Sequence, residues 1–386
     1  MTQGAIRAGI VAGEASGDLI GSHLVAALKA REPRLAFSGI GGGKLIAQGV
    51  ESLYPMETLS VRGYVEVLRH YREIMGVRRK LVARFLAERP ALFIGVDAPD
   101  FNLELERQLR EGGIPAVHFV GPSVWAWRRW RLKRIAKSVS HMLVMFPFEA
   151  PIYEAEGIPA TYVGHPLADV IPLAIDRAAA REALKLPRSK LLVALLPGSR
   201  RQELHYMADD FVNAAKRLHE SLGEVRFVVP MASRQTKELF EAALHRNGAA
   251  ELPLTLMFGH SHEALAAADV ALVGSGTATL EAALFKTPMV ITYRQSPVTW
   301  ALMKRMLYLP WIGLPNILAR EFLCDELVQE QATPGKLAAA LLSLLQDTAR
   351  QQRQRERFLA MHEELRQDTA SKAADAVLRV MASQRA

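Results

Sequence analysis

The stretch LLVALLPGSRRQE at residues 191–203 places the tightest limits on how this chain can fold. Its apolar first half is typical of a strand buried on both faces of a parallel sheet. The turn Pro197-Gly198-Ser199-Arg200 ends that strand, and a helical pattern follows. Backbone N–H groups at such a helix start favour an anion, and the Arg200 guanidinium suits phosphate oxygens. Alone, the pattern also fits an ordinary strand-to-helix turn with a solvated arginine.

The bulk composition narrows the class of protein and of partner. The 386 residues are 50% hydrophobic and 23% charged, which predicts a soluble globular chain of two or more domains. The net charge of +8 favours an anionic partner, such as nucleic acid, anionic lipid or a phosphorylated substrate. A single cysteine, Cys324, excludes a disulfide framework and a cysteine-cluster metal site, and it fits a reducing compartment. The N-terminal residues do not read as a signal peptide, so any membrane association is expected to be peripheral.

The first βα turn has the sequence GEASGD at residues 13–18, directly after a predicted strand at 7–12. We expect Ser16 to be the N-cap of the helix that follows. Glu14 places a carboxylate at the carboxyl end of a strand, where sheets of this kind bind ligands. A purely structural turn has nearly the same support from spacing alone.

Two carboxylates follow the predicted strand 91–96, in the sequence DAPDFN. Pro99 prevents a helix from running through both of them. Asp100 is well placed to cap the next helix. Asp97 lies at the edge of the buried strand, where partial desolvation raises a carboxyl pKa toward that of a useful base. Asp97 is therefore the preferred catalytic candidate, with Asp100 as the second.

Residues 61–82 combine apolar positions at helical spacing with many arginines. One interpretation is a core-facing amphipathic helix with a solvated basic face. The other is a helix on an anionic membrane surface, with Val65 and Leu68 facing the lipid and Arg72 its head groups. The sequence supports both equally.

Tryptophans and arginines alternate in the sequence WAWRRWR at residues 125–131. Trp125, Trp127 and Arg128 are suited to stacking the bases of a single-stranded nucleic acid. They are equally suited to a lipid–water boundary, where they would hold a phosphorylated head group. A packed aromatic helix with outward arginines is the third interpretation.

A second glycine and hydroxyl turn follows the predicted strand 270–273. Ser275, Gly276 and Thr277 are small, so a ligand can approach the backbone at a helix start. Glu281 lies one helical turn beyond Thr277, where it can accept hydrogen bonds from a sugar diol. Asn316 is expected in a loop, where ligand contact and turn formation are both open.

Two successive series of alternating strands and helices predict two doubly wound, Rossmann-like α/β domains that face each other across a cleft. We place the first domain at residues 1–168 and the second at 169–345. Residues 346–386 are expected to form C-terminal helices that cross back to the first domain or to a partner chain.

Motifs along nearly the whole chain resemble the lipid-A-disaccharide synthases. They are GEASGD at 13–18, GVDAPDFN at 95–102, PSVWAW at 122–127, VGHP at 163–166, LLPGSR at 195–200, SGTATLE at 275–281 and LPN at 314–316. The resemblance implies a GT-B fold and an inverting glycosyl transfer that uses neither metal nor cofactor. It implies transfer from UDP-2,3-diacylglucosamine to the 6-hydroxyl of 2,3-diacylglucosamine 1-phosphate, on the cytoplasmic face of the inner membrane.

The resemblance also implies roles for individual residues. Asp97 matches the family's proposed base, and Glu14 lies in its first turn. Arg200, with Gly198 and Ser199, would face the donor pyrophosphate. Glu281 would face the ribose, and Asn316 would lie in the donor pocket. Gly121 and Arg201 depart from residues common in the family, which puts only local turn geometry in doubt.

Other functions remain open at this point. Within the same fold, a UDP-sugar 2-epimerase or an undecaprenyl-linked transferase would use a similar donor site. A nucleic-acid-binding protein is the alternative from another class, although we expect no nucleic-acid partner. A homodimer is a further expectation.

Overall fold

The computed structural model describes residues 4–59 and 64–383, and it describes residues 64–70 by their backbone alone. The chain divides into two compact units. Unit 1 holds the chain up to Asp169 together with the residues from Leu365 onward, and unit 2 holds Val170–Glu364.

Unit 1 is organised around a parallel sheet with the strand order β3-β2-β1-β4-β5-β6-β7. Its strands are short apolar runs, as expected where both faces of a sheet are covered. The order reverses direction between β1 and β4, which creates a switch point at the carboxyl ends of these two strands. The strands are β1 (Ile6–Ala12), β2 (Leu35–Ile40), β3 (Glu51–Tyr54), β4 (Leu92–Val96), β5 (Ala116–Phe119), β6 (His141–Val144) and β7 (Ala160–Tyr162).

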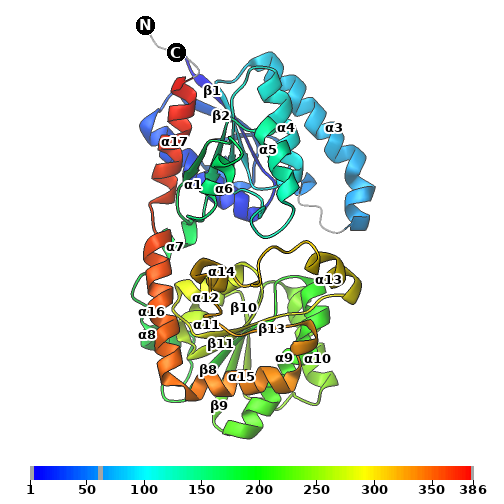
Figure 1. The fold of residues 1–386 in the computed structure, drawn as a ribbon, viewed down its shortest axis with the longest axis vertical. Coiled ribbons are helices and arrows are strands. Elements are labelled where there is room, and N and C mark those ends of the chain that lie inside the picture. The colour runs from blue at the N-terminus through cyan, green and yellow to red at the C-terminus, as the bar shows by residue number, and fades with distance from the viewer. Residues whose placement is uncertain (1–3, 60–63, 384–386) are drawn as a thin grey trace. The chain divides into compact units, whose positions relative to one another are not determined.

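Helices cover both faces of the unit 1 sheet. Alternate strand residues enter separate cores, because successive side chains of a strand point to opposite faces. Ile10 packs with α1 and α17, whereas Val11 packs with α3 and α4. Figure 1 shows α17 alongside α1. The helices are α1 (Ala15–Arg31), α2 (Gly43–Ala47), α3 (Tyr64–Glu88), α4 (Pro99–Glu111), α5 (Leu132–Ser138), α6 (Ala150–Glu154), α7 (Pro166–Val170, at the boundary) and α17 (Thr369–Ser383), with 3-10 turns η1 (Met56–Thr58) and η2 (Arg129–Arg131).

Unit 2 repeats this architecture with the strand order β10-β9-β8-β11-β12-β13. Its switch point lies between β8 and β11. The strands are β8 (Leu191–Leu196), β9 (Val225–Met231), β10 (Leu254–Phe258), β11 (Val270–Gly274), β12 (Met289–Tyr293) and β13 (Glu326–Val328). The predicted fold class, two doubly wound α/β domains, is confirmed.

The helices of unit 2 also lie on both faces of its sheet. α9, α10 and α15 share one apolar core with the strands, and α8, α11 and α12 cover the opposite face (Figure 1). The helices are α8 (Arg177–Ala183), α9 (Arg201–Leu222), α10 (Arg234–Arg246), α11 (Ser261–Ala267), α12 (Thr277–Leu284), α13 (Pro297–Lys304), α14 (Leu314–Ala319), α15 (Pro334–Gln346) and α16 (Thr348–Leu365), with the 3-10 turn η3 (Gln329–Gln331).

The C-terminal segment is shared between the two units. Gln354 of α16 accepts a hydrogen bond from Met289 N at 2.9 Å, which anchors α16 to the unit 2 sheet. The Asp169 carboxylate accepts bonds from the N–H groups of residues 367, 368 and 369 at 2.7–3.0 Å, and so fixes the start of α17 in unit 1. The residues predicted as one C-terminal segment, 346–386, therefore belong to different units on either side of Leu365.

In the described part of the chain, no helix is both long and apolar enough to cross a bilayer.

Candidate active site

A cavity of about 470 Å³ opens at the carboxyl ends of β8, β9 and β11 in unit 2. Leu196, Met231 and Gly274, at the ends of these strands, line it. The cavity therefore lies at the switch point between β8 and β11, which is where open parallel sheets bind their ligands.

The cavity gathers most of the residues that the sequence singled out in this unit. Asn316 is the exception. The others line the cavity: Gly198, Ser199, Arg200, Ser275, Gly276, Thr277 and Glu281.

The turn after β8 is fixed by Glu203, a residue that the sequence reasoning missed. The N–H groups of Ser199 and Arg200 both donate to Glu203 Oε2, at 2.9 and 3.1 Å. Gly198 has φ +128°, and a Cβ there would lie 2.5 Å from the same oxygen, so only glycine fits. The two amides expected to hold phosphate thus already hold a carboxylate. The Arg200 side chain, 64% exposed, forms an ion pair with Glu203 at 3.1 Å.

The turn after β11 leads into α12 through Gly276, with φ +134°. The Ser275 backbone N–H donates to Thr292 O at 2.9 Å, and its hydroxyl donates to Ile312 O at 3.1 Å. Ser275 is therefore held by its neighbours. The first N–H groups of a helix have no acceptor within that helix, and Thr277 and Ala278, the first two residues of α12, line the cavity.

Glu281 faces His262, which the sequence analysis did not identify. The Glu281 carboxylate and His262 Nε2 are 3.6 Å apart. Burial raises the pKa of Glu281, and the nearby His262 partly offsets that rise. A half-buried carboxylate of this kind on the cavity wall can accept hydrogen bonds from ligand hydroxyls.

The expectation for Asn316 is wrong in one respect. Asn316 lies in α14, not in a loop, and its side chain is fully buried. Its amide donates to Cys324 O at 2.9 Å and to Glu326 Oε1 at 2.8 Å, and its oxygen accepts from Cys324 N at 2.8 Å. Asn316 therefore fixes α14 to Cys324 and to the start of β13.

In unit 1, the turns after β1 and β4 lie against each other. A Cβ placed on Gly13 would be 2.7 Å from Ala98 Cβ, and one placed on Gly17 would be 3.6 Å from Asp97 Cβ. The two carboxylate-bearing turns predicted separately, at 13–18 and 97–102, therefore meet at the switch point of this sheet.

Within the first of these turns the helix boundary differs from the prediction. Glu14, not Ser16, is the N-cap of α1, which begins at Ala15. Ser16 is exposed on the first turn of the helix. Asp18, which the sequence reasoning left without a role, accepts hydrogen bonds from the N–H groups of Gly42, Lys44 and Leu45 and so fixes the start of α2.

Asp97 has a left-handed backbone with φ +55°, and Ala98 follows it with φ +45°. Asp97 Oδ1 accepts a hydrogen bond from Ala98 N at 2.8 Å. The carboxylate is half-buried, at the carboxyl end of β4. Because one oxygen is held by the turn, the orientation of the carboxyl group is restricted.

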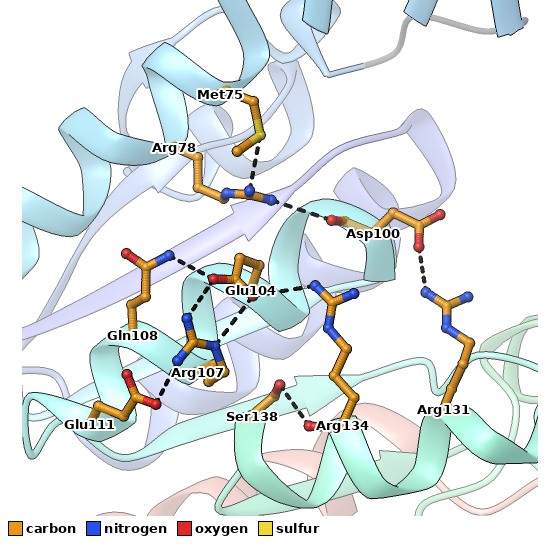
Figure 2. A network of polar contacts seen from close by, with 10 residues as sticks. All are labelled: Met75, Arg78, Asp100, Glu104, Arg107, Gln108, Glu111, Arg131, Arg134 and Ser138. Atoms are coloured by element: carbon orange, nitrogen blue, oxygen red, sulfur yellow. Dashed lines mark hydrogen bonds and ion pairs between the residues drawn. The ribbon is translucent and has the colours of Figure 1, made fainter. Parts of the chain in front are cut away.

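Asp100 is part of a network of polar contacts, most of them between charged side chains, as Figure 2 shows. Its carboxylate, 87% exposed, pairs with Arg131, and its backbone oxygen accepts from Arg78 at 3.5 Å. In the same network Arg107 holds the pKa of the Glu104 carboxyl down at about 2. These contacts join α3, α4 and α5, which gives Asp100 a structural environment unlike that of Asp97.

Trp125 does not lie at a lipid or nucleic-acid surface. It is 8% exposed, its indole N–H donates to Glu149 Oε1 at 3.0 Å, and its ring makes edge contacts with Phe146 and Phe148. The interfacial interpretation is therefore wrong for this residue. Trp127 is half-buried, with the Arg128 guanidinium 4.0 Å from its ring centroid, and Trp130 is 68% exposed.

Glu149 makes this part of unit 1 sensitive to pH. Burial raises the pKa of its carboxyl from 4.5 to about 7, against the opposing effect of hydrogen bonds from Phe146 N, the Trp125 indole and Met145 N. The unfolded chain releases this proton at lower pH than the folded one. The resulting stabilisation is complete below pH 4.5 and is lost as the pH rises to about 7.

We expect the loss to amount to about 3 kcal/mol, at 1.36 kcal/mol for each unit of pKa difference. Glu149→Gln has no proton to release, so its urea midpoint should vary less between pH 4.5 and pH 7 than that of the wild type. Glu154 is exposed, so Glu154→Gln is the control. Its urea midpoint should change between pH 4.5 and pH 7 by as much as that of the wild type. If the urea midpoints of the wild type and of Glu149→Gln changed equally between pH 4.5 and pH 7, the prediction would be contradicted.

The helix predicted at 61–82 is α3, and its later part belongs to the core. Val77, Leu81 and Phe85 are buried against the sheet. Arg72 is exposed. The side chains of Val65 and Leu68 lie outside the described residues.

Some of the missed residues carried a signal in the sequence and others did not. Glu203 stands three residues after Arg200, the spacing of a capping box, and could have been found. His262 acts through Glu281, which is far away in sequence, so no local pattern marks it. Glu149 accepts hydrogen bonds from the nearby Met145 N and Phe146 N, but its contact with Trp125 is distant in sequence. Within residues 4–59 and 64–383, no group of three or more metal-ligating side chains is placed to hold a metal ion.

Comparison with known proteins identifies a family along the whole chain. The model of the lipid-A-disaccharide synthetase family matches residues 9–380. A lipid-A-disaccharide synthase of Azoarcus sp. is 57% identical over 377 residues, covering 98% of this chain and 96% of that protein. One from Methylobacillus flagellatus is 54% identical over 370 residues, covering 96% and 98%.

Solved structures with the same fold are far more distant in sequence. UDP-GlcNAc 2-epimerase from Neisseria meningitidis, bound to UDP-GlcNAc, superposes with a TM-score of 0.63 at 10% identity, covering 98% of this chain and 100% of that one. A glycosyltransferase from Rickettsia africae gives 0.58 at 9% identity, covering 99% of both chains. At 9–10% identity, this similarity shows a shared fold and nothing further.

Proposed function

Because this chain belongs to the lipid-A-disaccharide synthase family, we propose that it transfers 2,3-diacylglucosamine from UDP-2,3-diacylglucosamine to the 6-hydroxyl of 2,3-diacylglucosamine 1-phosphate. The chain is a glycosyltransferase with the GT-B fold. The proposed products are UDP and a β(1→6)-linked tetraacyl disaccharide 1-phosphate. The epimerase and undecaprenyl-linked alternatives are not favoured, since the family match covers residues 9–380.

The cavity of unit 2 is the proposed site of the UDP group. The Arg200 guanidinium offers paired donors to phosphate oxygens, and the start of α12 at Thr277 offers backbone N–H groups. Glu203 occupies the amides of Ser199 and Arg200. We therefore assign the pyrophosphate to Arg200 and α12 rather than to those two amides. Glu281 is the proposed acceptor of hydrogen bonds from the ribose.

The proposed chemistry is a single displacement with inversion. The 6-hydroxyl oxygen forms a bond to the anomeric carbon, the bond from that carbon to the phosphate oxygen of UDP breaks, and Asp97 takes the hydroxyl proton. UDP is a good leaving group, so no general acid is required. Arg200 and the donors of α12 stabilise the charge that develops on the departing phosphate. Glu14, in the turn that abuts Asp97, is the second carboxylate proposed at the acceptor site.

The observation that carries this proposal is a cavity at the β8/β11 switch point that brings together an arginine, a helix start and a carboxylate in a chain of this family. The purified protein should release UDP from UDP-2,3-diacylglucosamine only when the acylated monosaccharide phosphate is present. UDP release without that acceptor, or formation of an epimerised UDP-sugar, would contradict it. So would salt-sensitive oligonucleotide binding without UDP affinity.

We also propose that the protein works as a peripheral protein on the anionic cytoplasmic face of the inner membrane, where its acylated substrates lie. The net charge of +8 and the basic, apolar pattern of residues 61–72 support this location. The assembly proposed there is a homodimer.

A vesicle-binding measurement tests the membrane proposal. The double variant Val65→Ser/Leu68→Ser should co-sediment less with anionic phospholipid vesicles than the wild type, because two apolar anchors are lost. Its thermal unfolding should be unchanged. Ile46→Ser, which alters a 52% exposed residue on α2, is the matched control and should bind like the wild type. Loss of folding in the double variant would place these side chains in the core instead.

A further inference from the structure

Three polar side chains are buried together beneath the turn that carries Asp97. Asn102 and Glu106 lie on α4 and His118 on β5, and all three are fully buried. A buried polar atom without a hydrogen bond is costly, and among the described residues each of these side chains has one such atom: Asn102 Oδ1, Glu106 Oε2 and His118 Nε2. The hydrogen bonds that the three side chains do make show what they hold in place.

Asn102 connects two neighbouring strand ends. Its amide nitrogen donates to Asp97 O at 2.8 Å and also contacts Val11 O at 3.2 Å. A longer contact of 3.5 Å reaches Val96 O. One side chain thus ties the end of β1 and the end of β4 to the start of α4.

The backbone that Asn102 holds is in an unfavourable conformation. Asp97 and Ala98 have φ of +55° and +45°, and a left-handed backbone is unfavourable for a residue with a side chain. Asp97 N donates to Phe119 O at 2.9 Å, so the residue is fixed on its amino side by β5. On its carbonyl side it is fixed by Asn102, which leaves the carboxylate little freedom.

The sequence makes room for this arrangement. A Cβ on Gly95 would lie 2.0 Å from Glu106 Oε1 and 3.0 Å from Asn102 Cβ, so glycine is required above them. Glu106 Oε1 lies 2.7 Å from His118 Nδ1, and this pair joins α4 to β5. The position of Asn102 on α4 is therefore fixed by the Glu106–His118 pair as well as by its own hydrogen bonds to the strand ends.

We propose that Asn102 is a positioning residue that holds Asp97 in its left-handed turn, so that the carboxylate is oriented to take the acceptor proton. This inference rests on the proposed role of Asp97 as the base. Asn102 itself touches no reacting atom, since its amide is directed at main-chain carbonyls.

Asn102→Ala tests the proposal. With the amide gone, the Asp97 turn can relax toward ordinary backbone angles and move the carboxylate. We expect kcat to fall by about 10- to 100-fold, since a displacement of about 1 Å can cost 100-fold in rate. UDP affinity, a property of unit 2, should be unchanged. Turnover is measured well below the unfolding temperature of each variant.

A double-mutant cycle shows whether Asn102 acts through Asp97. In an Asp97→Asn background, Asn102→Ala should cause no further loss, because the carboxylate that it positions is already gone. A residue that only stabilises the fold would lower the residual turnover of both backgrounds equally, and that result would overturn the proposal. Asn213→Ala, which removes amide hydrogen bonds within unit 2, is the structural control and should keep the wild-type kcat.

The remaining outcomes separate this inference from the function that it rests on. If Asp97→Asn turns over like the wild type, the base assignment fails and this inference fails with it. If Asp97→Asn is inactive but Asn102→Ala has wild-type kcat, only the positioning role fails. Should Asn102→Ala not fold, Asn102→Ser, whose hydroxyl is one bond shorter than the amide and does not reach the Asp97 carbonyl, must show reduced kcat with unchanged UDP affinity, and wild-type kcat in that variant would overturn the proposal.

Discussion

Asp97→Asn is expected to lower kcat by about 10²- to 10⁴-fold, the usual contribution of a general base. The amide keeps the size of the side chain and can still accept the hydrogen bond that Asp97 Oδ1 takes from Ala98 N. It cannot take the proton of the acceptor hydroxyl. UDP affinity, measured by calorimetry, should match that of the wild type.

Asp100→Asn is the matched control, because it changes the same chemical group three residues away. The Asp100 carboxylate is paired with Arg131 and 87% exposed, so its loss should change kcat by no more than a few fold. If Asp100→Asn abolished turnover and Asp97→Asn did not, the two carboxylates would have to exchange roles.

Arg200→Ala should weaken UDP binding by about 10- to 100-fold, because a charge-assisted hydrogen bond contributes about 1.5–3 kcal/mol. The loss is compounded by Glu203. With its arginine partner removed, the Glu203 carboxylate stays on the cavity wall and repels the phosphates. The turnover rate should fall as well, since Arg200 also faces the charge that builds up on the departing phosphate.

Arg201→Ala removes the same charge from the next residue, which is exposed and does not line the cavity. Its UDP affinity should stay close to that of the wild type. Equal losses in the two variants would indicate a general electrostatic effect of the basic α9 start, and unchanged affinity in Arg200→Ala would remove Arg200 from the donor site.

Turns that depend on local chemistry were predictable from the sequence. The glycine turn at 274–277 and the Pro-Gly turn at 197–200 were placed correctly, because an apolar run followed by glycine defines the end of a strand. The sheet order then brought Asp97 next to the first turn, as two strand ends at one switch point require.

Side-chain roles that depend on distant partners were not predictable in the same way. Trp125 lies in a segment rich in arginine, yet it is buried because Glu149 and two phenylalanines, from a later part of the chain, enclose it. Asn316 was expected in a loop but lies buried in α14. Its burial depends on Cys324 and Glu326, which local periodicity does not reveal.

Helix starts were intermediate in difficulty. Ser16 has the ideal side chain for an N-cap, but the backbone places Glu14 there and makes Ser16 part of the helix. At α9 the capping partner is Glu203, and the predicted phosphate amides of Ser199 and Arg200 are already bound to it. In both turns the sequence predicted which residues stand near the helix start, but it did not predict which hydrogen bonds they form.

Unit 1 is assembled from two segments of the chain that are separated by the whole of unit 2. One face of its sheet stays uncovered until α17 is made, because Ala374 and Val377 of that helix complete the core there, whereas unit 2 is a single continuous segment. A premature stop after α16 would thus leave the earliest-made half of the protein with an uncovered apolar face, vulnerable to aggregation and proteolysis. The cell's quality control would then act on the N-terminal half of the protein, although the truncation lies at the C-terminal end of the chain.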